Sequence, residues 1–219
     1  MYAEAITMGY DWNSEYWGRH LSQPERNDLF DDMWIKRHES VLKGLSGRAL
    51  DLGCGIGQNS DYLSELGFSV IGADLSTVAL SELRRRNPKI ETVALDMTSP
   101  LPFDDKSFDI VVASLSIHYF SRKDTRSLCA EILRVLVDGG IFIGAVNSSL
   151  AYKYIADHAI TLEDNFYLSG NRFIRLFDRA QFDEFFGDYE RILLELTHSV
   201  RFGEPKDMWE FIFRKPISN

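Results

Sequence analysis

The sequence predicts an α/β fold: one seven-stranded, mostly parallel sheet with one antiparallel strand and helices on both faces. Three observations predict it. Short apolar runs alternate with amphipathic helical patterns through residues 45–147, which is typical of parallel sheets. The first run, at 49–52, breaks into glycines at alternate positions just before a helix begins. The last two apolar runs are joined by a Gly-Glu-Pro turn, which predicts the antiparallel strand.

The elements follow in order from these patterns. We predict strands at 49–52, 69–73, 90–95, 108–113, 141–146, 192–200 and 208–214. We predict helices ending near Gly67, over 77–87 after a Ser76 cap, over 123–137 up to an Asp138-Gly-Gly140 turn, and from Asp178 or Arg179 onward. A hairpin of 165–168 and 172–177 around a Ser-Gly-Asn turn is inserted at about 148–177.

The chain has 219 residues, enough for one domain with a substantial core. We divide it into an aromatic arm and helix at 1–44, the helix starting near Pro24, and a domain at 45–219. We predict that the arm forms a lid over a cofactor site, because aromatic surface excludes water and can line a cationic ligand, and that its Trp12, Tyr16 and Trp17 line the substrate. Packing of the arm onto the body is the alternative.

The composition of the chain argues against several classes of binding partner. The formal net charge of −9 argues against a nucleic-acid partner, which needs a basic face. Two cysteines indicate no disulfide framework, and the N-terminus shows no signal-peptide pattern. No apolar run approaches the length of a membrane span. We therefore expect a cytoplasmic monomer or homodimer without a membrane or nucleic-acid partner.

The glycine loop carries the most specific signal. A nicotinamide-binding G-x-G-x-x-G motif fails, because Gln58 or Ser60 stands where its third glycine would be. The motif present is D-x-G-x-G-x-G, from Asp51 to Gly57, and here the chain resembles the class I S-adenosylmethionine-dependent methyltransferases. The stretches 101–114 and 132–140 also resemble signatures of that superfamily, although Val-Asp replaces the common Lys-Pro in the second. The general arrangement is similar to unassigned bacterial methyltransferases related to tellurite-resistance and ubiquinone- or menaquinone-type enzymes.

Acidic residues follow the next two predicted strands at the same sheet edge. Asp74 lies 21 residues after Gly53, where a carboxylate can accept both hydroxyls of a ribose, and Asp96 suits the exocyclic amine of adenine. A helix N-cap or a solvated loop charge is the alternative for each. A dehydrogenase would also carry an acid near the position of Asp74.

The resemblance implies a Rossmann-like fold and S-adenosyl-L-methionine as cofactor, with S-adenosyl-L-homocysteine as product. It assigns the ribose and adenine roles to Asp74 and Asp96, and it places Leu75 and Met97 against the adenine. The glycine loop then lies near the methionine part, with Asp51 attracting the ammonium group. The candidate cofactor-binding residues are Asp51, Gly53, Cys54, Gly55, Gly57, Asn59, Asp74, Leu75, Ser76, Asp96, Met97, Ser114 and Leu115.

Methyl transfer from a sulfonium depends mainly on orientation and exclusion of water, and it needs a base only for a protonated nucleophile. His118, after the fourth strand, is the candidate base, with a structural histidine as the alternative. Tyr119 and Asn147 are candidates for lining the substrate, and no residue pattern indicates a metal. We predict an S-adenosylmethionine-dependent methyltransferase acting on a small molecule. A non-catalytic cofactor-binding subunit and a nicotinamide-dependent oxidoreductase are the rivals.

Overall fold

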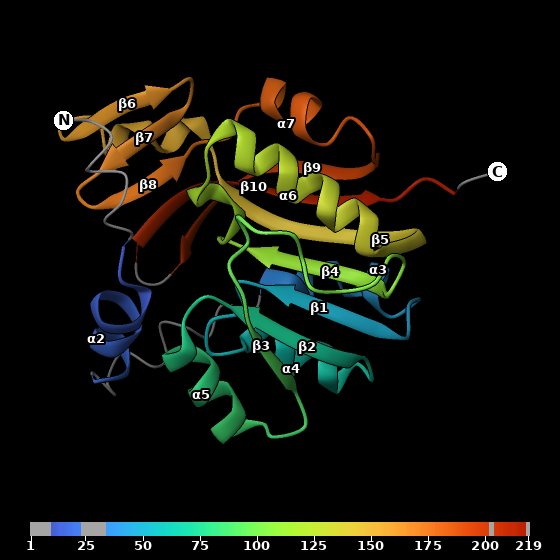
Figure 1. The fold of residues 1–219 in the computed structure, drawn as a ribbon. Helices are drawn as coiled ribbons and strands as arrows, with labels where there is room; N and C mark the ends of the chain where they lie inside the picture. The colour runs from blue at the N-terminus through green and yellow to red at the C-terminus, as the bar shows by residue number, and fades with distance from the viewer. Residues whose placement is uncertain (1–9, 23–33, 202–203, 218–219) are drawn as a thin grey trace.

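A seven-stranded sheet forms the centre of the computed structural model, which describes residues 10–22, 34–201 and 204–217 (Figure 1). The strands lie in the order β3 (Glu91–Ala94), β2 (Ser69–Asp74), β1 (Arg48–Leu52), β4 (Phe108–Ser114), β5 (Leu136–Asn147), β10 (Glu204–Arg214) and β9 (Glu190–Arg201). Strand β10 runs antiparallel to both of its neighbours, and the other pairs are parallel. The predicted fold class is therefore confirmed.

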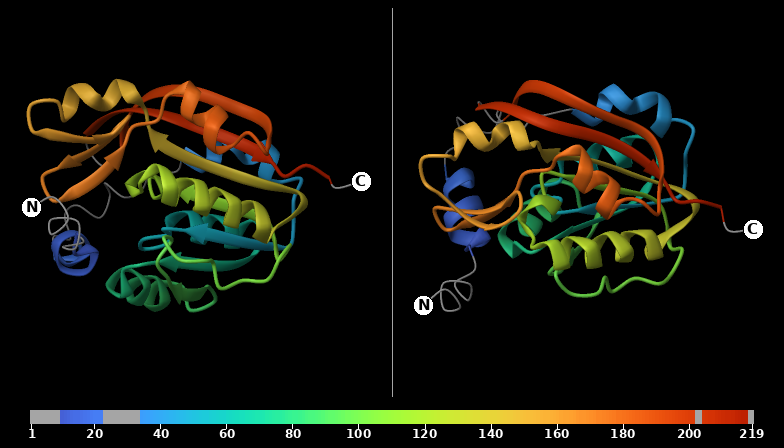
Figure 2. Two further views of the ribbon diagram at one scale, coloured as in Figure 1. Left: turned by 45° about the horizontal axis from the view of Figure 1, so that its top comes forward. Right: turned by 90° about the horizontal axis from the view of Figure 1, so that it is seen from above.

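Both faces of the sheet are buried, because neighbouring residues on each strand point to opposite sides. On β4, Ile110 and Val112 join one core cluster, whereas Val111 and Ala113 join the other. The first cluster packs against α3 (Glu39–Leu42), α4 (Gln58–Glu65) and α5 (Thr77–Arg86). The second packs against α6 (Arg122–Val135) and α7 (Arg179–Phe185), as the two views in Figure 2 show.

Side-chain caps fix where three of the helices begin. Ser76 and Ser121 each accept a hydrogen bond from a backbone N–H in the first turn of α5 and α6. At α7, Asp178 and Gln181 form a reciprocal capping box, so the predicted start at 178 or 179 is confirmed. None of the helices in the described residues is long and apolar enough to span a membrane.

The connection from α6 to β5 differs from the prediction. The Asp138-Gly-Gly140 stretch, expected as a turn before the fifth strand, lies inside β5, which begins at Leu136. Leu136 already pairs with Phe108 of β4, and the register shifts before Ile110 pairs with Ile141. Gly139 takes a φ of 79° within this irregularity. The glycines thus serve a bulge in the strand rather than a separate turn.

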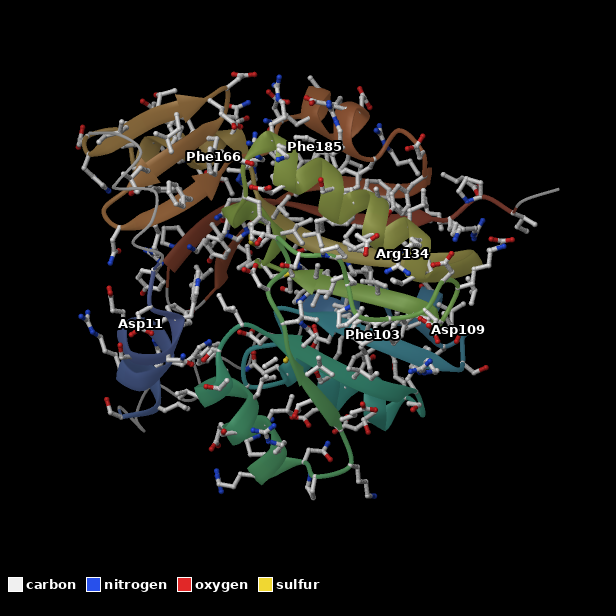
Figure 3. The ribbon with its side chains drawn as sticks, viewed as in Figure 1. Asp11, Phe103, Asp109, Arg134, Phe166 and Phe185 are labelled. Carbon is white, nitrogen blue, oxygen red and sulfur yellow. The ribbon has the colours of Figure 1, made fainter. Side chains whose placement is uncertain are left out.

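The loop between β3 and β4 contains no helix, in keeping with its two prolines. Arg134, near the end of α6, holds this loop by donating to the carbonyl oxygens of Leu101 (3.0 Å) and Phe103 (2.8 Å). Its guanidinium also pairs with Glu131 and Asp105, each at 2.8 Å. Arg134 and Phe103, labelled in Figure 3, therefore lie together on the α6 face of the sheet.

The segment inserted between β5 and α7 forms a second, three-stranded antiparallel sheet. It comprises β6 (Ala159–Glu163), β7 (Phe166–Ser169) and β8 (Arg172–Arg175), after a 3₁₀ turn η5 (Ser149–Tyr154). The predicted hairpin corresponds to β7 and β8, and β6 was not predicted. Ile160 and Leu162 of β6 alternate with Thr161 and Glu163, but this run is only four residues long, too short to be a clear strand signal, and both apolar side chains are exposed.

Arg175 joins this small sheet to the main domain, and its side chain is completely buried. The guanidinium donates to the carbonyl oxygen of Phe120 at 3.0 Å and pairs with Glu163 at 2.6 Å. It also lies over the rings of Phe166 and Phe185, which Figure 3 shows near the junction of the small sheet and α7. The insertion is thereby held at the edge of the main sheet where β4 ends.

Near the N-terminus, a π-helical turn η1 (Trp12–Gly18) leads into α2 (Arg19–Leu21). Asp11, labelled in Figure 3, caps η1 by accepting from the backbone N–H groups of Asn13 and Ser14. Part of the helix predicted from Pro24 lies outside the described residues, and its remainder is a 3₁₀ turn η3 (Trp34–His38) followed by α3. The division into an arm at 1–44 and a domain at 45–219 stays a prediction.

Two glycines with the same backbone conformation allow a matched stability test. Gly57 (φ 89°) and Gly67 (φ 95°) both lie in the left-handed region, but a Cβ on Gly57 would stand 2.2 Å from a methyl of Leu83, whereas a Cβ on Gly67 meets nothing within 4 Å. We expect Gly67→Ala to cost about 1 kcal/mol of unfolding free energy and Gly57→Ala about 2–4 kcal/mol, measured by urea denaturation. Equal losses would contradict the close contact of α4 with α5.

Candidate active site

The glycine loop between β1 and α4 is fastened to the end of β2. The backbone N–H groups of Gly53 and Cys54 both donate to the carbonyl oxygen of Ala73, at 2.7 and 3.0 Å. The N–H of Gly55 donates to Oδ2 of Asp74 at 2.8 Å. The loop geometry therefore depends on the strand beside it as well as on its own glycines.

Two of these glycines permit close approaches that a larger residue would block. Gly53 and Gly55 have φ values of 70° and 54°. A Cβ on Gly53 would lie 2.3 Å from Cβ of Ser116, and one on Gly55 would lie 2.5 Å from the indole of Trp17. The loop is thus enclosed between the segment that follows β4 and the N-terminal segment η1.

A cavity of about 290 Å³ lies over this loop. The carboxyl ends of β1 and β4 point to the edge of the sheet where η1, α2 and the three-stranded sheet lie (Figure 1). The predicted residues that line the cavity are Trp12, Tyr16, Trp17, Gly53, Cys54, Gly55, Asn59, Asp74, Leu75, Asp96, Met97, Ser114, Leu115, His118, Tyr119 and Asn147. Cavities beyond the carboxyl ends of parallel strands are the usual ligand sites of such sheets.

Three predicted residues do not line the cavity. Asp51 is completely buried, and its Oδ2 accepts from Ser60 Oγ at 2.6 Å beneath α4. Gly57 is the N-cap residue of α4, and Ser76 caps α5. These three residues therefore stabilise the glycine loop and the first turns of α4 and α5.

Asp74 combines burial with backbone hydrogen bonds. Besides the bond from Gly55, its Oδ1 accepts from the N–H of Ser76 at 2.8 Å. Burial raises the pKa of this carboxyl above its ordinary value, and the hydrogen bonds from Ser76 and Gly55 oppose the rise. Asp96 is exposed, and its Oδ1 accepts from the N–H and the hydroxyl of Thr98 at 2.9 and 2.8 Å.

His118 lies in a short 3₁₀ turn, η4 (Ile117–Tyr119), directly after β4. The residue is 2% exposed, and within the described part of the chain its Nδ1 has no hydrogen-bond partner. Burial, followed by the positive charges of Lys206 and Arg172, lowers the pKa of His118 to about 3. The imidazole is therefore neutral near pH 7, with a ring nitrogen available for a ligand.

Aromatic rings from η1 meet η4 across the cavity. The ring of Trp12 makes an edge-to-face contact with Tyr119, with centroids 4.8 Å apart, and with Tyr16 at 5.4 Å. Tyr16 in turn contacts Trp17 at 5.0 Å. Edge-to-face pairs of this kind give a site apolar walls of fixed orientation.

Sequence reasoning missed several lining residues. They are Trp34, Ile56, Gln58, Leu95, Ser116, Phe120, Arg172, Ile174 and Lys206. Five of these, Ile56, Gln58, Leu95, Ser116 and Phe120, follow the same strand ends as predicted residues, so the loops around the predicted motifs were a usable signal for them. Arg172 and Ile174 belong to β8 and Lys206 to β10, and their arrival at the cavity depends on long-range packing that no local motif reports.

The comparisons with known proteins agree with this geometry. Residues 50–144 match a family model described as "Methyltransferase domain". An uncharacterized methyltransferase of Synechocystis is 36% identical over 48% of this chain and 51% of its own length. The demethylmenaquinone methyltransferase of Beutenbergia cavernae is 36% identical over 52% of this chain and 47% of its own. By this similarity, residues 50–144 of the chain form a methyltransferase domain.

The fold agrees with solved methyltransferases along the length of the chain. The 1,6-didemethyltoxoflavin-N1-methyltransferase of Burkholderia thailandensis, solved with 1,6-didemethyltoxoflavin and S-adenosylhomocysteine, superposes with a TM-score of 0.67. It is 18% identical, and the match covers 98% of this chain and 89% of the other. By sequence, this chain spans about half the length of the curated methyltransferases it matches.

The cavity of the methyltransferase domain has the groups that S-adenosylmethionine requires. Asp74 and Asp96 supply carboxylate acceptors for hydroxyl and amino groups. Leu75 is 50% exposed, so a flat apolar ring would bury it. Behind the loop, Oδ1 of Asp51 is buried and has no hydrogen-bond partner among the described residues. The residues present therefore fit the cofactor of the family.

The buried Asp51 predicts a pH-dependent stability difference. Burial raises the pKa of this carboxyl from 3.8 to about 7, opposed by Ser60 and reinforced by Asp74. Because the folded-state pKa lies above the unfolded value, the contribution of Asp51 to stability is fully present below about pH 4 and is lost as the pH rises through about 7. Relative to wild type, Asp51→Asn should gain roughly 2–4 kcal/mol of unfolding free energy over this window.

Urea denaturation of both proteins across the pH range measures this gain, and the comparison cancels other groups that titrate there, such as His118. Asp157→Asn, at an exposed residue, is the matched control and should show a constant difference from wild type. A constant difference for Asp51→Asn would show that the carboxyl is solvated.

Proposed function

We propose that this protein is an enzyme that transfers a methyl group from S-adenosylmethionine to a small-molecule acceptor. The observation that carries the proposal is the cavity over the glycine loop, whose walls come from η1, η4, the three-stranded sheet and β10. Its volume of about 290 Å³ is near the lower end of the pockets that hold small ligands. Walls from four separate segments favour a small acceptor over an extended chain.

The names of two similar proteins support a small acceptor. The Beutenbergia relative is named for demethylmenaquinone, and the Burkholderia enzyme was solved with 1,6-didemethyltoxoflavin. Both are small organic molecules. The acceptor of the present protein is proposed by analogy with them and from its own cavity.

The cofactor supplies a methyl group on a positively charged sulfur, which is already activated for transfer. The residues around the cofactor then bind it and orient it toward the acceptor. In this proposal Asp74 accepts from the ribose hydroxyls, and Asp96 accepts from the adenine amine. Leu75 and Met97 cover the adenine, and the backbone of 53–57 lies along the methionine part. Asp51 does not line the cavity. In this proposal its buried carboxylate attracts the ammonium group from beneath the loop.

The segment Trp12–Leu21 acts as a lid in this proposal. Oδ1 of Asn13 accepts from Ser76 Oγ at 2.9 Å and from the N–H of Val78 at 3.2 Å, so the segment rests on the start of α5. On its other side, Asn171 of the small sheet donates to Glu15 at 2.6 Å. The lid thus bridges the main domain and the insertion, and its aromatic rings exclude water from the reacting groups.

In this proposal a ring nitrogen of His118 is the proton acceptor at the end of the cavity where the small molecule that receives the methyl group binds. As a neutral imidazole it can take a hydrogen bond from a protonated nucleophile, or take its proton as the methyl group arrives. Its pKa of about 3 makes it a weak base in the ligand-free protein. Orientation of the nucleophile by the ring is therefore its main contribution, with proton removal depending on the charge of the bound acceptor.

A labelling experiment tests the proposed acceptor class. The purified protein is incubated with methyl-labelled S-adenosylmethionine and a cell extract separated into small-molecule, protein and RNA fractions. We expect label only in the small-molecule fraction. Label confined to protein or RNA would contradict the proposal, and label in no fraction would favour the non-catalytic rival.

A substitution of His118 tests its role. We expect His118→Gln to lower turnover about tenfold or more, while its affinity for S-adenosylhomocysteine changes little, because the imidazole acts on the acceptor. His158→Gln, at an exposed histidine of the insertion, is the control and should keep full activity. Full turnover by His118→Gln would show that His118 is only structural.

A further inference from the structure

Part of the cavity wall comes from η3, through the indole of Trp34. Trp34 is 3% exposed and belongs to the core cluster that contains Cys54 of the glycine loop and Ala145 of β5. The turn η3 is five residues long, and the hydrogen bonds of a 3₁₀ turn are poorly aligned. The place of Trp34 in the wall therefore depends on the side-chain contacts that hold η3 against the sheet.

Glu210 of β10 makes two of these contacts. Its Oε2 lies 3.0 Å from Nε2 of His38, and its Oε1 accepts a hydrogen bond from the guanidinium of Arg37. Glu210 is 1% exposed. The ring of His38 also meets the indole of Trp34 edge-on, with centroids 5.8 Å apart. The carboxylate is thus connected to the cavity wall through a single side chain, that of His38.

The same contacts place η3 on one side of the sheet. Figure 2 shows η3 and α3 in light blue beside the red strands β9 and β10, in agreement with the bonds to Glu210. In the sheet order, β10 lies far from β2 and β3, whose ends carry Asp74 and Asp96. Trp34 therefore comes from the side of the sheet away from the proposed ribose and adenine contacts. In the proposed enzyme, this is the side of the acceptor.

The stability of the core does not explain a carboxylate at position 210. Met208 and Ile212, on the same face of β10, are buried and apolar. A buried ion pair contributes little stability compared with apolar side chains that fill the same space. The side chain of Arg37 is 50% exposed, so water can solvate its charge without Glu210. What the carboxylate adds is direction, because one of its oxygens holds the ring of His38 in a single orientation.

We propose that Glu210 is a positioning residue that fixes the indole of Trp34 in the cavity wall by holding His38. This inference rests on the proposed function and adds a residue to its acceptor site. Without the carboxylate, the imidazole and the indole beside it are free to turn, so the wall loses its single shape. The acceptor then binds more weakly. The cofactor is little affected, because its proposed contacts lie at the ends of β1, β2 and β3.

Fluorine NMR of the protein labelled with fluorotryptophan tests the connection directly, in the presence of S-adenosylhomocysteine. The chain has four tryptophans, and the Trp34→Phe variant identifies the resonance of Trp34. We expect Glu210→Gln to shift or broaden this resonance and to leave those of Trp12 and Trp17 in place. Glu195→Gln is the matched control, at an exposed residue that pairs with Glu210 across the strands, and it should leave the Trp34 resonance unchanged.

Transfer of label tests the consequence for the acceptor. The small-molecule fraction of the extract is supplied at a series of dilutions, after the affinity for S-adenosylhomocysteine has been measured by calorimetry. We expect Glu210→Gln to need at least about fivefold more of the fraction for half-maximal transfer, with its affinity for S-adenosylhomocysteine changed less than about twofold. In the Trp34→Phe background, Glu210→Gln should add nothing further, because the two side chains act as one unit.

A Trp34 resonance that stays in place in Glu210→Gln would overturn the inference, and with a lower urea midpoint it would show that Glu210 only stabilises the fold. An unchanged half-maximal amount, or additive effects of the two substitutions, would also overturn it. If Glu210→Gln does not fold, His38→Phe breaks the same connection and should move the same resonance. Failure of the proposed function is seen separately, as label in protein or RNA, and the resonance still reports whether Glu210 positions Trp34.

Discussion

The carboxylate of Asp74 is the interaction on which the site depends. It accepts hydrogen bonds from Gly55 and Ser76, so one side chain joins the glycine loop to the start of α5. Burial works against its charge, and the two N–H groups compensate. A loop of glycines is costly to order on its own. Fastened to β2 in this way, the loop keeps a fixed shape before any ligand binds, which reduces the entropy lost on binding.

Around this base the chain adds two segments that lie outside the seven-stranded sheet. The insertion after β5 is anchored by the buried Arg175, which donates to Phe120 just after η4. The N-terminal segment rests on α5 through Asn13 and contacts the insertion through Glu15. In the proposed enzyme, the loop and the strand ends hold the cofactor, and the added segments shape the space for the acceptor.

The sequence predicted the parts of the site that local patterns encode. Strand ends and glycines placed Gly53, Gly55 and Asp74 at one edge, because parallel strands end on the same side. Asp51 alternates with Leu50 and Leu52 on β1, and this period of two turns its side chain beneath α4 instead of into the cavity. Arg172 and Lys206 could not be predicted, because their contact with the cavity arises from tertiary packing of distant strands.

The central claim is that the glycine loop and Asp74 form the cofactor site, and calorimetric titration with S-adenosylhomocysteine tests it most directly. Wild type, Asp74→Asn and the exposed control Asp157→Asn are compared after each is shown to be folded. We expect wild type and the control to bind alike and Asp74→Asn to bind at least about tenfold more weakly, since charged hydrogen bonds contribute about 1.5–3 kcal/mol. No binding by folded wild type, or equal binding by Asp74→Asn, would contradict the account.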